Sequence, residues 1–336
     1  MRLSYLISDN AVFAMDVPIL LPGTGKGKMT VIFDDIEYNF EFNEENWVAE
    51  LPPHKAGGPF RMTVIFDDII VHRQSFSNIH VGIVVLLAGQ SNAELKMCET
   101  NTPDYFCRSN DNVRIFTFDR PERGKEIFKE EDGWQCAREN QVKNLSAIAY
   151  LTAMLLSKNT GLVCGVICCY QGASMIYSWL PKEAAERLMP PENQLHYDYN
   201  AYPDWNSPGI LYDLMLKKTQ GFGLSCVIWY QGESDTTPGE AKCYRAAANL
   251  LIDEIRKGCG NKLLPVLIVQ IADFDSRNDE GWKLLQMAQL ELENRNENIF
   301  VVSAGDICES NMIHPVSKFP LAVRLADKIM ALIFRG

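Results

Sequence analysis

The stretch IVVLLAGQSN, residues 83–92, joins a run of apolar side chains to a short polar segment that ends in Gln90, Ser91 and Asn92. A continuous apolar run of this length is typical of a strand buried on both faces of a sheet. Helical patterns separate it from further runs of the same kind, and strands that alternate with helices form parallel sheets covered on both sides. These further runs lie at residues 162–170, 226–231, 265–272 and 299–304. We therefore predict an α/β fold with three layers, α/β/α, around a parallel sheet.

Three amphipathic stretches lie between the predicted strands and are expected to form helices. They run from Ser146 to Lys158, from Gly239 to Lys257 and from Gly281 to Arg295, and glycines follow the first two. In open parallel sheets, ligands bind beyond the carboxyl ends of the strands. The segments that follow three of the predicted strands, AGQSN (88–92), YQGAS (170–174) and YQGES (230–234), therefore mark the predicted site.

Residues 1–78 differ from the rest of the chain. Apolar and polar residues alternate there, with Gly, Pro and Asp between them, and no helical stripe is present. The octapeptide MTVIFDDI occurs twice, at 29–36 and 62–69. This 33-residue offset also matches ankyrin repeats, but β-rich copies with Asp-Asp turns fit a pair of hairpins better. We predict a small β-sandwich (jelly-roll-like) domain over 1–78 and the α/β domain over 79–336.

Composition and charge exclude several functional classes. The formal net charge is −11 and no long Lys/Arg cluster is present, so neither nucleic acid nor a membrane surface is an expected partner. No signal-peptide pattern opens the chain and no apolar run is long enough to span a membrane, which favours a soluble, cytoplasmic protein, or a secreted one if a leader was removed. The ten cysteines are scattered without CxxC spacing, so we expect reduced thiols, no metal site and no cofactor.

Ser91 is the candidate nucleophile. A serine directly after a buried strand can present its hydroxyl and its backbone N–H to the same point in a cleft. The same position also suits an ordinary polar turn. Among the five histidines, only His314 follows the last predicted strand and directly precedes the last helix, where it would face Ser91 across the strand ends. A histidine that only packs against or caps that helix is the alternative.

Three motifs carry a family resemblance. LLAGQSNAELKM (86–97) resembles the first block of the SGNH hydrolases as it occurs in sialate O-acetylesterases and the related acetyl-xylan esterases. WYQGESD (229–235) is similar to the third block, and IHP (313–315) with Lys318 is similar to the histidine block. The resemblance extends over nearly the whole chain. It implies the flavodoxin-like SGNH-hydrolase fold for the α/β domain.

The same resemblance implies an activity. The expected function is that of a serine esterase that removes acetyl groups from a carbohydrate, with sialate 9-O-acetyl esters as the first choice. An acetyl-xylan or other hemicellulose acetylesterase is the alternative within the enzyme class. A catalytically weak carbohydrate-binding relative is the alternative from another class. An acetylated sugar or glycan is thus the expected partner, and homo-oligomerisation stays open.

The resemblance also implies roles for individual residues. Ser91 would be the nucleophile and His314 its general base. The oxyanion hole would consist of the backbone N–H groups of Ser91 and Gly172 and the side-chain amide of Gln231. Such donors are needed because attack on an ester places negative charge on the carbonyl oxygen. A buried amide that holds neighbouring loops together is the alternative role for Gln231.

One departure from the family pattern concerns the group that orients the histidine. An aspartate usually lies two or three residues before it, and this chain has Asn311 and Met312 there. The nearest acids upstream are Glu309 and Asp306. The candidates are a displaced acid, a Ser-His dyad oriented by a backbone carbonyl or an amide such as that of Asn311, and weakened activity. We favour the first two, because the nucleophile, the donors and the histidine are retained.

An aromatic-rich segment, residues 190–208, is the expected substrate side. Tyr202 and Trp205 within it, and Trp179 before it, are candidates to bind the apolar faces of a sugar ring. An oligomer interface explains exposed aromatics equally well. If the sugar is a sialic acid, Arg114 and Lys96 are candidates to pair with its carboxylate, because both lie near the motifs in sequence.

Overall fold

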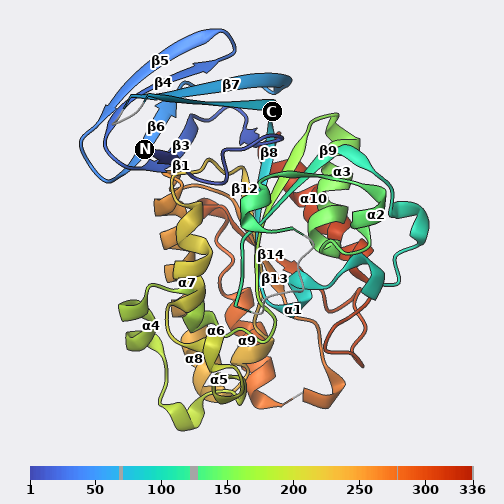
Figure 1. The fold of residues 1–336 in the computed structure, drawn as a ribbon. Helices are drawn as coiled ribbons and strands as arrows, with labels where there is room; N and C mark the ends of the chain where they lie inside the picture. The colour runs from blue at the N-terminus through green and yellow to red at the C-terminus, as the bar shows by residue number, and fades with distance from the viewer. Residues whose placement is uncertain (68–70, 122–127, 278, 335–336) are drawn as a thin grey trace.

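The computed structural model describes residues 1–67, 71–121, 128–277 and 279–334, and its centre is a large, mostly parallel sheet (Figure 1). The strand order is β10-β9-β11-β8-β12-β13-β14, and only β10 runs antiparallel to its neighbour on this path. The strands are β8 (His72–Gly89), β9 (Asn110–Thr117), β10 (Gln135–Ala137), β11 (Cys164–Tyr170), β12 (Cys226–Tyr230), β13 (Val266–Gln270) and β14 (Ile299–Ser303). All five predicted strands are confirmed, and β9 and β10 add an edge that the continuous apolar runs did not predict.

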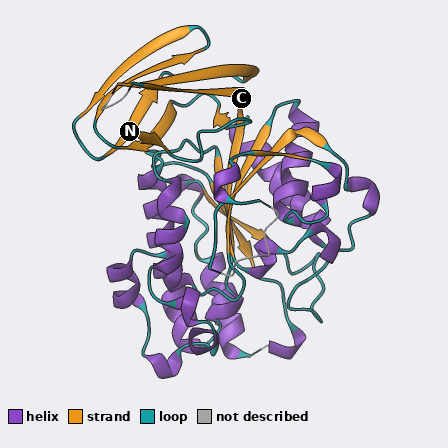
Figure 2. Cartoon of the chain, viewed as in Figure 1, coloured by secondary structure: helices purple, strands orange, loops and turns teal. Residues whose placement is uncertain are grey.

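Helices cover both faces of this sheet, as Figures 1 and 2 show. On one face lie α3 (Ala147–Thr160) and α10 (Lys318–Ile333), and their apolar side chains share a core with the strands. On the other face lie α7 (Ile210–Leu214), α8 (Pro238–Gly258) and α9 (Glu280–Leu290). The shorter helices are α1 (Ser91–Glu94), α2 (Glu139–Val142), α4 (Lys182–Leu188), α5 (Asp198–Ala201) and α6 (Pro203–Asn206). The prediction of a sheet with helices on both faces is therefore confirmed.

Local sequence signals set the helix ends. The Ser146 hydroxyl accepts a hydrogen bond from the Ala149 N–H at the start of α3, and Gly161 ends that helix with a φ of 73°. At the start of α8, Thr237 and Glu240 form a capping box. The third predicted helix, α9, ends at Leu290, five residues before the predicted end at Arg295. Among the described residues, no helix is long and apolar enough to cross a membrane.

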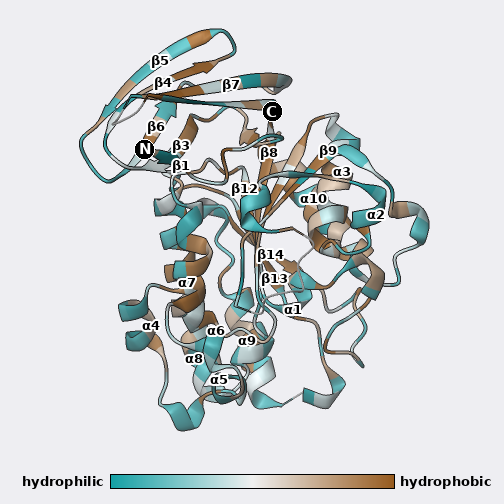
Figure 3. Cartoon of the chain, viewed as in Figure 1, coloured by the Kyte–Doolittle hydropathy of each residue, from teal (hydrophilic) through white to brown (hydrophobic). Residues whose placement is uncertain are grey.

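The N-terminal strands lie in two sheets, one of which continues into the large sheet. β1 (Arg2–Leu3), β3 (Ile19–Thr24) and β6 (Asn46–Leu51) form one sheet. β4 (Gly27–Phe33), β5 (Ile36–Phe42) and β7 (Gly57–Asp67) join the other through β8, which also pairs with β2 (Val12–Ala14). The predicted boundary between residues 78 and 79 therefore lies inside β8, and a separate small β-sandwich stays a prediction. Hydrophobic residues lie along many of the strands (brown in Figure 3), and one core cluster contains buried side chains of both regions.

The two copies of MTVIFDDI pair with each other. Met29 lies opposite Phe66 and Phe33 opposite Met62 in the antiparallel β4–β7 ladder. The first copy forms the predicted hairpin, because Phe33 pairs with Ile36 and the two intervening aspartates both have positive φ. The corresponding turn of the second copy lies partly outside the described residues, which end at Asp67 and resume at Val71.

Candidate active site

The three predicted polar segments meet at the carboxyl ends of β8, β11 and β12. Gly89 lies opposite Tyr170 on one side and opposite Tyr230 on the other. The backbone approaches closely here, since a Cβ on Gly89 would lie 2.0 Å from the Tyr230 carbonyl oxygen, and its φ is 151°. The chain then turns into α1, whose first residue is Ser91. Glycine at position 89 thus allows the strand to deliver Ser91 to the edge of the sheet.

Ser91 and His314 contact each other at this edge. Nε2 of His314 lies 2.8 Å from Oγ of Ser91. His314 belongs to the segment between β14 and α10, so the contact joins residues 223 positions apart. Partial desolvation of the ring and the positive charge of Lys318 lower the pKa of His314 below its ordinary value, while Glu94 and Glu99 act in the opposite direction. The imidazole is therefore favoured in its neutral form, which can accept a proton.

None of the three predicted orienting residues contacts the His314 ring. Glu309 accepts hydrogen bonds from the backbone N–H and the hydroxyl of Ser317, at 3.2 and 2.5 Å. Asp306 pairs with both terminal nitrogens of Arg324, at 2.6 and 2.5 Å. Asn311 is exposed, and no residue in the described part of the chain forms a hydrogen bond with Nδ1 of His314. Both acids are thus engaged by residues other than His314.

The predicted oxyanion donors differ in their surroundings. Within the described residues, no group accepts a hydrogen bond from the N–H of Ser91, the first residue of α1. The N–H of Gly172 lies beside Ser91, since a Cβ on Gly172 would be 3.7 Å from the Ser91 Cβ, but it donates to the Glu94 carboxylate at 3.1 Å. Glu94 also pairs with Arg120 at 2.7 Å. The Ser91 N–H is therefore the donor that is open to a ligand.

Gln231 takes the alternative role that we considered for it. Its side chain is fully buried, and its amide donates to the Ser174 carbonyl at 2.9 Å and to Asp235 at 2.5 Å. Its side-chain oxygen accepts from the Tyr244 hydroxyl at 3.0 Å. Both amide hydrogens are thus used within the protein, so the geometry does not support Gln231 as an oxyanion donor. The expectation is corrected to a buried amide that joins neighbouring loops.

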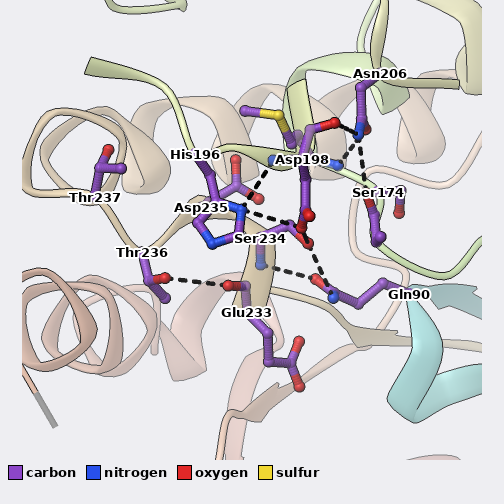
Figure 4. A network of polar contacts seen from close by, with 12 residues as sticks. Gln90, Ser174, His196, Asp198, Asn206, Glu233, Ser234, Asp235, Thr236 and Thr237 are labelled. Carbon is purple, nitrogen blue, oxygen red and sulfur yellow. Dashed lines mark hydrogen bonds and ion pairs between the residues drawn. The ribbon is translucent and has the colours of Figure 1, made fainter. Parts of the chain in front are cut away.

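A buried polar network lies behind the nucleophile turn (Figure 4). The Gln90 side chain accepts from the Gly232 N–H at 3.1 Å and donates to the Ser234 hydroxyl at 3.3 Å. Ser234 in turn donates to Asp198 at 2.7 Å, and Asp198 lies 3.1 Å from Nδ1 of His196. This network fixes the residue that precedes Ser91. Sequence reasoning did not find His196 or Asp198, because neither lies in a motif that follows a strand.

The three candidate aromatics have different environments. Trp179 is fully buried, donates to the Ser174 hydroxyl at 3.0 Å and packs edge-on against Trp229. It is a core residue, so the prediction that it binds substrate is corrected. Tyr202 and Trp205 stack on each other with ring centroids 4.9 Å apart, and Tyr202 is 38% exposed.

The segment that carries the stacked pair is anchored beside the second polar segment. Asn206 donates to the Ala173 carbonyl at 2.9 Å and accepts from the Met175 N–H at 2.8 Å. Tyr202 and Trp205 therefore stay candidates for sugar binding. Arg114 is buried and donates to the Cys136 thiol at 2.6 Å, so it is not available to an external carboxylate. In the part of the chain that the structure describes, no three His, Cys, Asp or Glu side chains are grouped to hold a metal ion.

Comparison with known proteins places this site in a family. The family model described as carbohydrate esterase, sialic acid-specific acetylesterase, matches residues 81–331. The chain belongs to this sialic acid-specific acetylesterase family. The matched span includes the Ser91 turn, the strand ends around it and His314. The family predicted from the three sequence motifs is therefore confirmed.

Individual relatives agree with the family assignment. The chain is 24% identical to the sialate O-acetylesterases of Pongo abelii and Homo sapiens across 84% of its length, and it spans 60% of the length of each. Its structure is similar to that of a carbohydrate acetylesterase from Xanthomonas citri, with a TM-score of 0.83 and 26% identity over all of this chain and 76% of the other. A protein from Arabidopsis thaliana, 19% identical, shares the fold with a TM-score of 0.53, over 74% of this chain and 98% of that one.

Proposed function

We propose that this sialic acid-specific acetylesterase family member is a serine esterase that hydrolyses O-acetyl esters of carbohydrates. The observation that carries the proposal is the 2.8 Å contact between His314 Nε2 and the Ser91 hydroxyl at the carboxyl edge of the sheet. A nucleophile and a base at hydrogen-bond distance form the minimal arrangement for acyl transfer. The N-terminal 78 residues would form a supporting β domain, and residues 79–336 would carry the chemistry.

The two residues act in sequence on the ester. His314 accepts the Ser91 proton as the Ser91 oxygen attacks the acetyl carbonyl, and the resulting tetrahedral intermediate collapses to an acetyl-serine. His314 returns the proton to the departing sugar oxygen. It then activates a water molecule that attacks the acetyl-serine, which releases acetate and restores Ser91.

The backbone N–H of Ser91 would stabilise the negative oxygen of the intermediate. Donors of this kind are each worth about 2.7–4 kcal/mol of the barrier. The Gly172 N–H would add a second donor once its bond to Glu94 is exchanged for one to the substrate. Gln231 has no part in this proposal, because its amide hydrogens are used internally.

The pH dependence of activity tests the role of His314. The reaction requires the neutral imidazole in the free enzyme, and burial and Lys318 lower the pKa of His314 below the ordinary 6.5. Activity is therefore retained as the pH falls through 6.5 and is lost only at lower pH. We expect the acid limb of kcat/KM for nitrophenyl acetate to have its midpoint below 6.5. A midpoint at or above 6.5, with circular dichroism showing a folded protein throughout, would contradict the assignment.

Acetate release from natural esters tests the substrate. We expect kcat/KM for 9-O-acetylated sialic acid to exceed that for acetyl-xylan by about tenfold or more, which corresponds to about 1.4 kcal/mol. Sialate is the first choice because the matched family and the two mammalian relatives are named for it. The reverse order would favour a hemicellulose acetylesterase. Binding of either sugar without acetate release would favour the non-catalytic alternative.

A further inference from the structure

Lys318, the first residue of α10, is fully buried beneath the site. Its ammonium donates to Oδ1 of Asn92 at 2.7 Å and lies 5.0 Å from the centroid of the Tyr230 ring. A buried ammonium costs several kcal/mol unless hydrogen bonds and an opposite charge compensate it. Burial lowers the pKa of Lys318 to about 8, so the side chain is mostly protonated at pH 7. The buried Lys318 ammonium therefore needs a partner that offsets the cost of burying its charge.

Asn92 provides that compensation by bridging two opposite charges. Its Oδ1 accepts from Lys318, while its Nδ2 donates to the buried Glu233 carboxylate at 2.5 Å. An ammonium can only donate and a carboxylate can only accept, so the orientation of the amide follows from its two partners. Burial raises the pKa of Glu233 overall, although hydrogen bonds from the backbone and from Asn92 and the charge of Lys318 act in the opposite direction. The three side chains form a buried, hydrogen-bonded chain, at the end of which Oε2 of Glu233 has no hydrogen-bond partner among the described residues.

The remaining hydrogen of this amide reaches the loop that carries the base. Nδ2 of Asn92 also donates to the carbonyl oxygen of Ile313, at 3.0 Å. Asn92 directly follows Ser91, and Ile313 directly precedes His314. The Asn92 side chain thus joins the turn that carries Ser91 to the loop that carries His314. Its hydrogen bond links the residues that adjoin Ser91 and His314.

We propose that Lys318, Asn92 and Glu233 form a positioning unit that holds His314 against Ser91 in place of an orienting carboxylate. The inference rests on the proposed function and concerns how its base is placed. Lys318 and Glu233 fix the amide of Asn92, and the amide fixes the backbone before His314. The charged groups that act on the ring are Lys318 from α10, Glu94 from α1 and Glu99 from the turn after it. After desolvation of the ring, the charge of Lys318 is the second cause that favours the unprotonated base.

Lys318→Met tests both effects, because methionine has a similar length but neither charge nor donor. We expect kcat for nitrophenyl acetate to fall by about 10- to 100-fold with little change in KM, since misplacement of a catalytic group by about 1 Å has an effect of this size. The acid limb of kcat/KM should also move to higher pH, because the cation that lowers the pKa of His314 is gone. A residue that only supports the fold would not move this limb.

Two further variants separate the effects. Asn92→Ala breaks the link to Ile313 without replacing Lys318, whose ammonium also lies 3.4 Å from the Tyr230 hydroxyl, so kcat should fall. Lys328→Met removes the same charge from the same helix at a position beside Phe300, away from Asn92. It should keep both the kcat and the pH profile of the wild type. Circular dichroism and thermal unfolding would establish that each variant is folded.

A folded Lys318→Met variant with an unmoved acid limb would overturn the inference. If that variant does not fold, Asn92→Ala decides, and a wild-type kcat there would also overturn it. Ser91→Ala, assayed in parallel, distinguishes failure of the positioning unit from failure of the proposed function. An inactive Ser91→Ala with unaffected Lys318→Met and Asn92→Ala would contradict only the positioning unit. An active Ser91→Ala would contradict the serine mechanism itself.

Discussion

Ser91→Ala is expected to abolish hydrolysis of nitrophenyl acetate, with a fall in kcat of roughly 10⁴-fold or more. Alanine removes the oxygen that would become the acetyl-serine. The α1 turn keeps its backbone bonds, since the N–H groups of Ala93 and Glu94 donate to the Gln90 carbonyl and not to Ser91. Initial rates corrected for spontaneous hydrolysis measure the effect, and circular dichroism reports the fold.

Ser207→Ala is the matched control for this variant. Ser207 is exposed, and its hydroxyl donates to the Pro203 carbonyl within the aromatic-rich segment. Its replacement should leave the rate near that of the wild type. If Ser91→Ala retained more than about a tenth of the activity, corresponding to a loss below about 1.4 kcal/mol, another group would have to be the nucleophile.

His314→Asn should lower kcat by about 10³-fold or more, the second-largest effect. Asparagine is polar and smaller than histidine, but it cannot accept the Ser91 proton at neutral pH. The residual rate should rise with hydroxide concentration and lose the acid limb that His314 produces. Steady-state rates between pH 5 and about 9 would measure both changes.

Asp306→Asn is the control that addresses the missing orienting acid. Asp306 forms an exposed ion pair with Arg324, and such surface pairs contribute little to stability. We expect kcat to stay near the wild-type value. A large loss of kcat in the folded variant would instead revive the displaced-acid alternative, with Asp306 as the group that orients His314.

Much of the fold was predictable because its signals are local. The apolar runs that form β8, β11, β12, β13 and β14 are continuous. A strand that is buried on both faces needs apolar residues at consecutive positions, so such runs predict it directly. The hairpin at Asp34-Asp35 follows from turn residues that tolerate positive φ. The long β8 was not predictable in the same way. Its first part alternates and its second part does not, because the strand passes from a sheet with one solvated face into one that helices cover on both faces.

The outcomes for Trp179 and Gln231 show where sequence reasoning ends. Trp179 precedes an aromatic-rich segment and was expected to contact substrate, but it packs against Trp229, fifty residues away along the chain. Gln231 lies in a motif at a strand end, yet its amide hydrogens are taken by Ser174 and Asp235. A side chain and its partners depend on contacts between distant segments. Neither outcome is encoded in the flanking residues.

The sequence by itself determined the five strands with continuous apolar runs, the helices α3, α8 and α9, the family and the identity of Ser91 as the candidate nucleophile, since each of these depends on neighbouring residues or on short motifs. Only the tertiary structure decided how His314 reaches Ser91 without a carboxylate at its ring. That answer depends on Asn92 meeting Lys318, Glu233 and the Ile313 carbonyl, up to 226 positions away along the chain. Hydrogen bonds between such distant groups form only once packing has excluded water from the space between them.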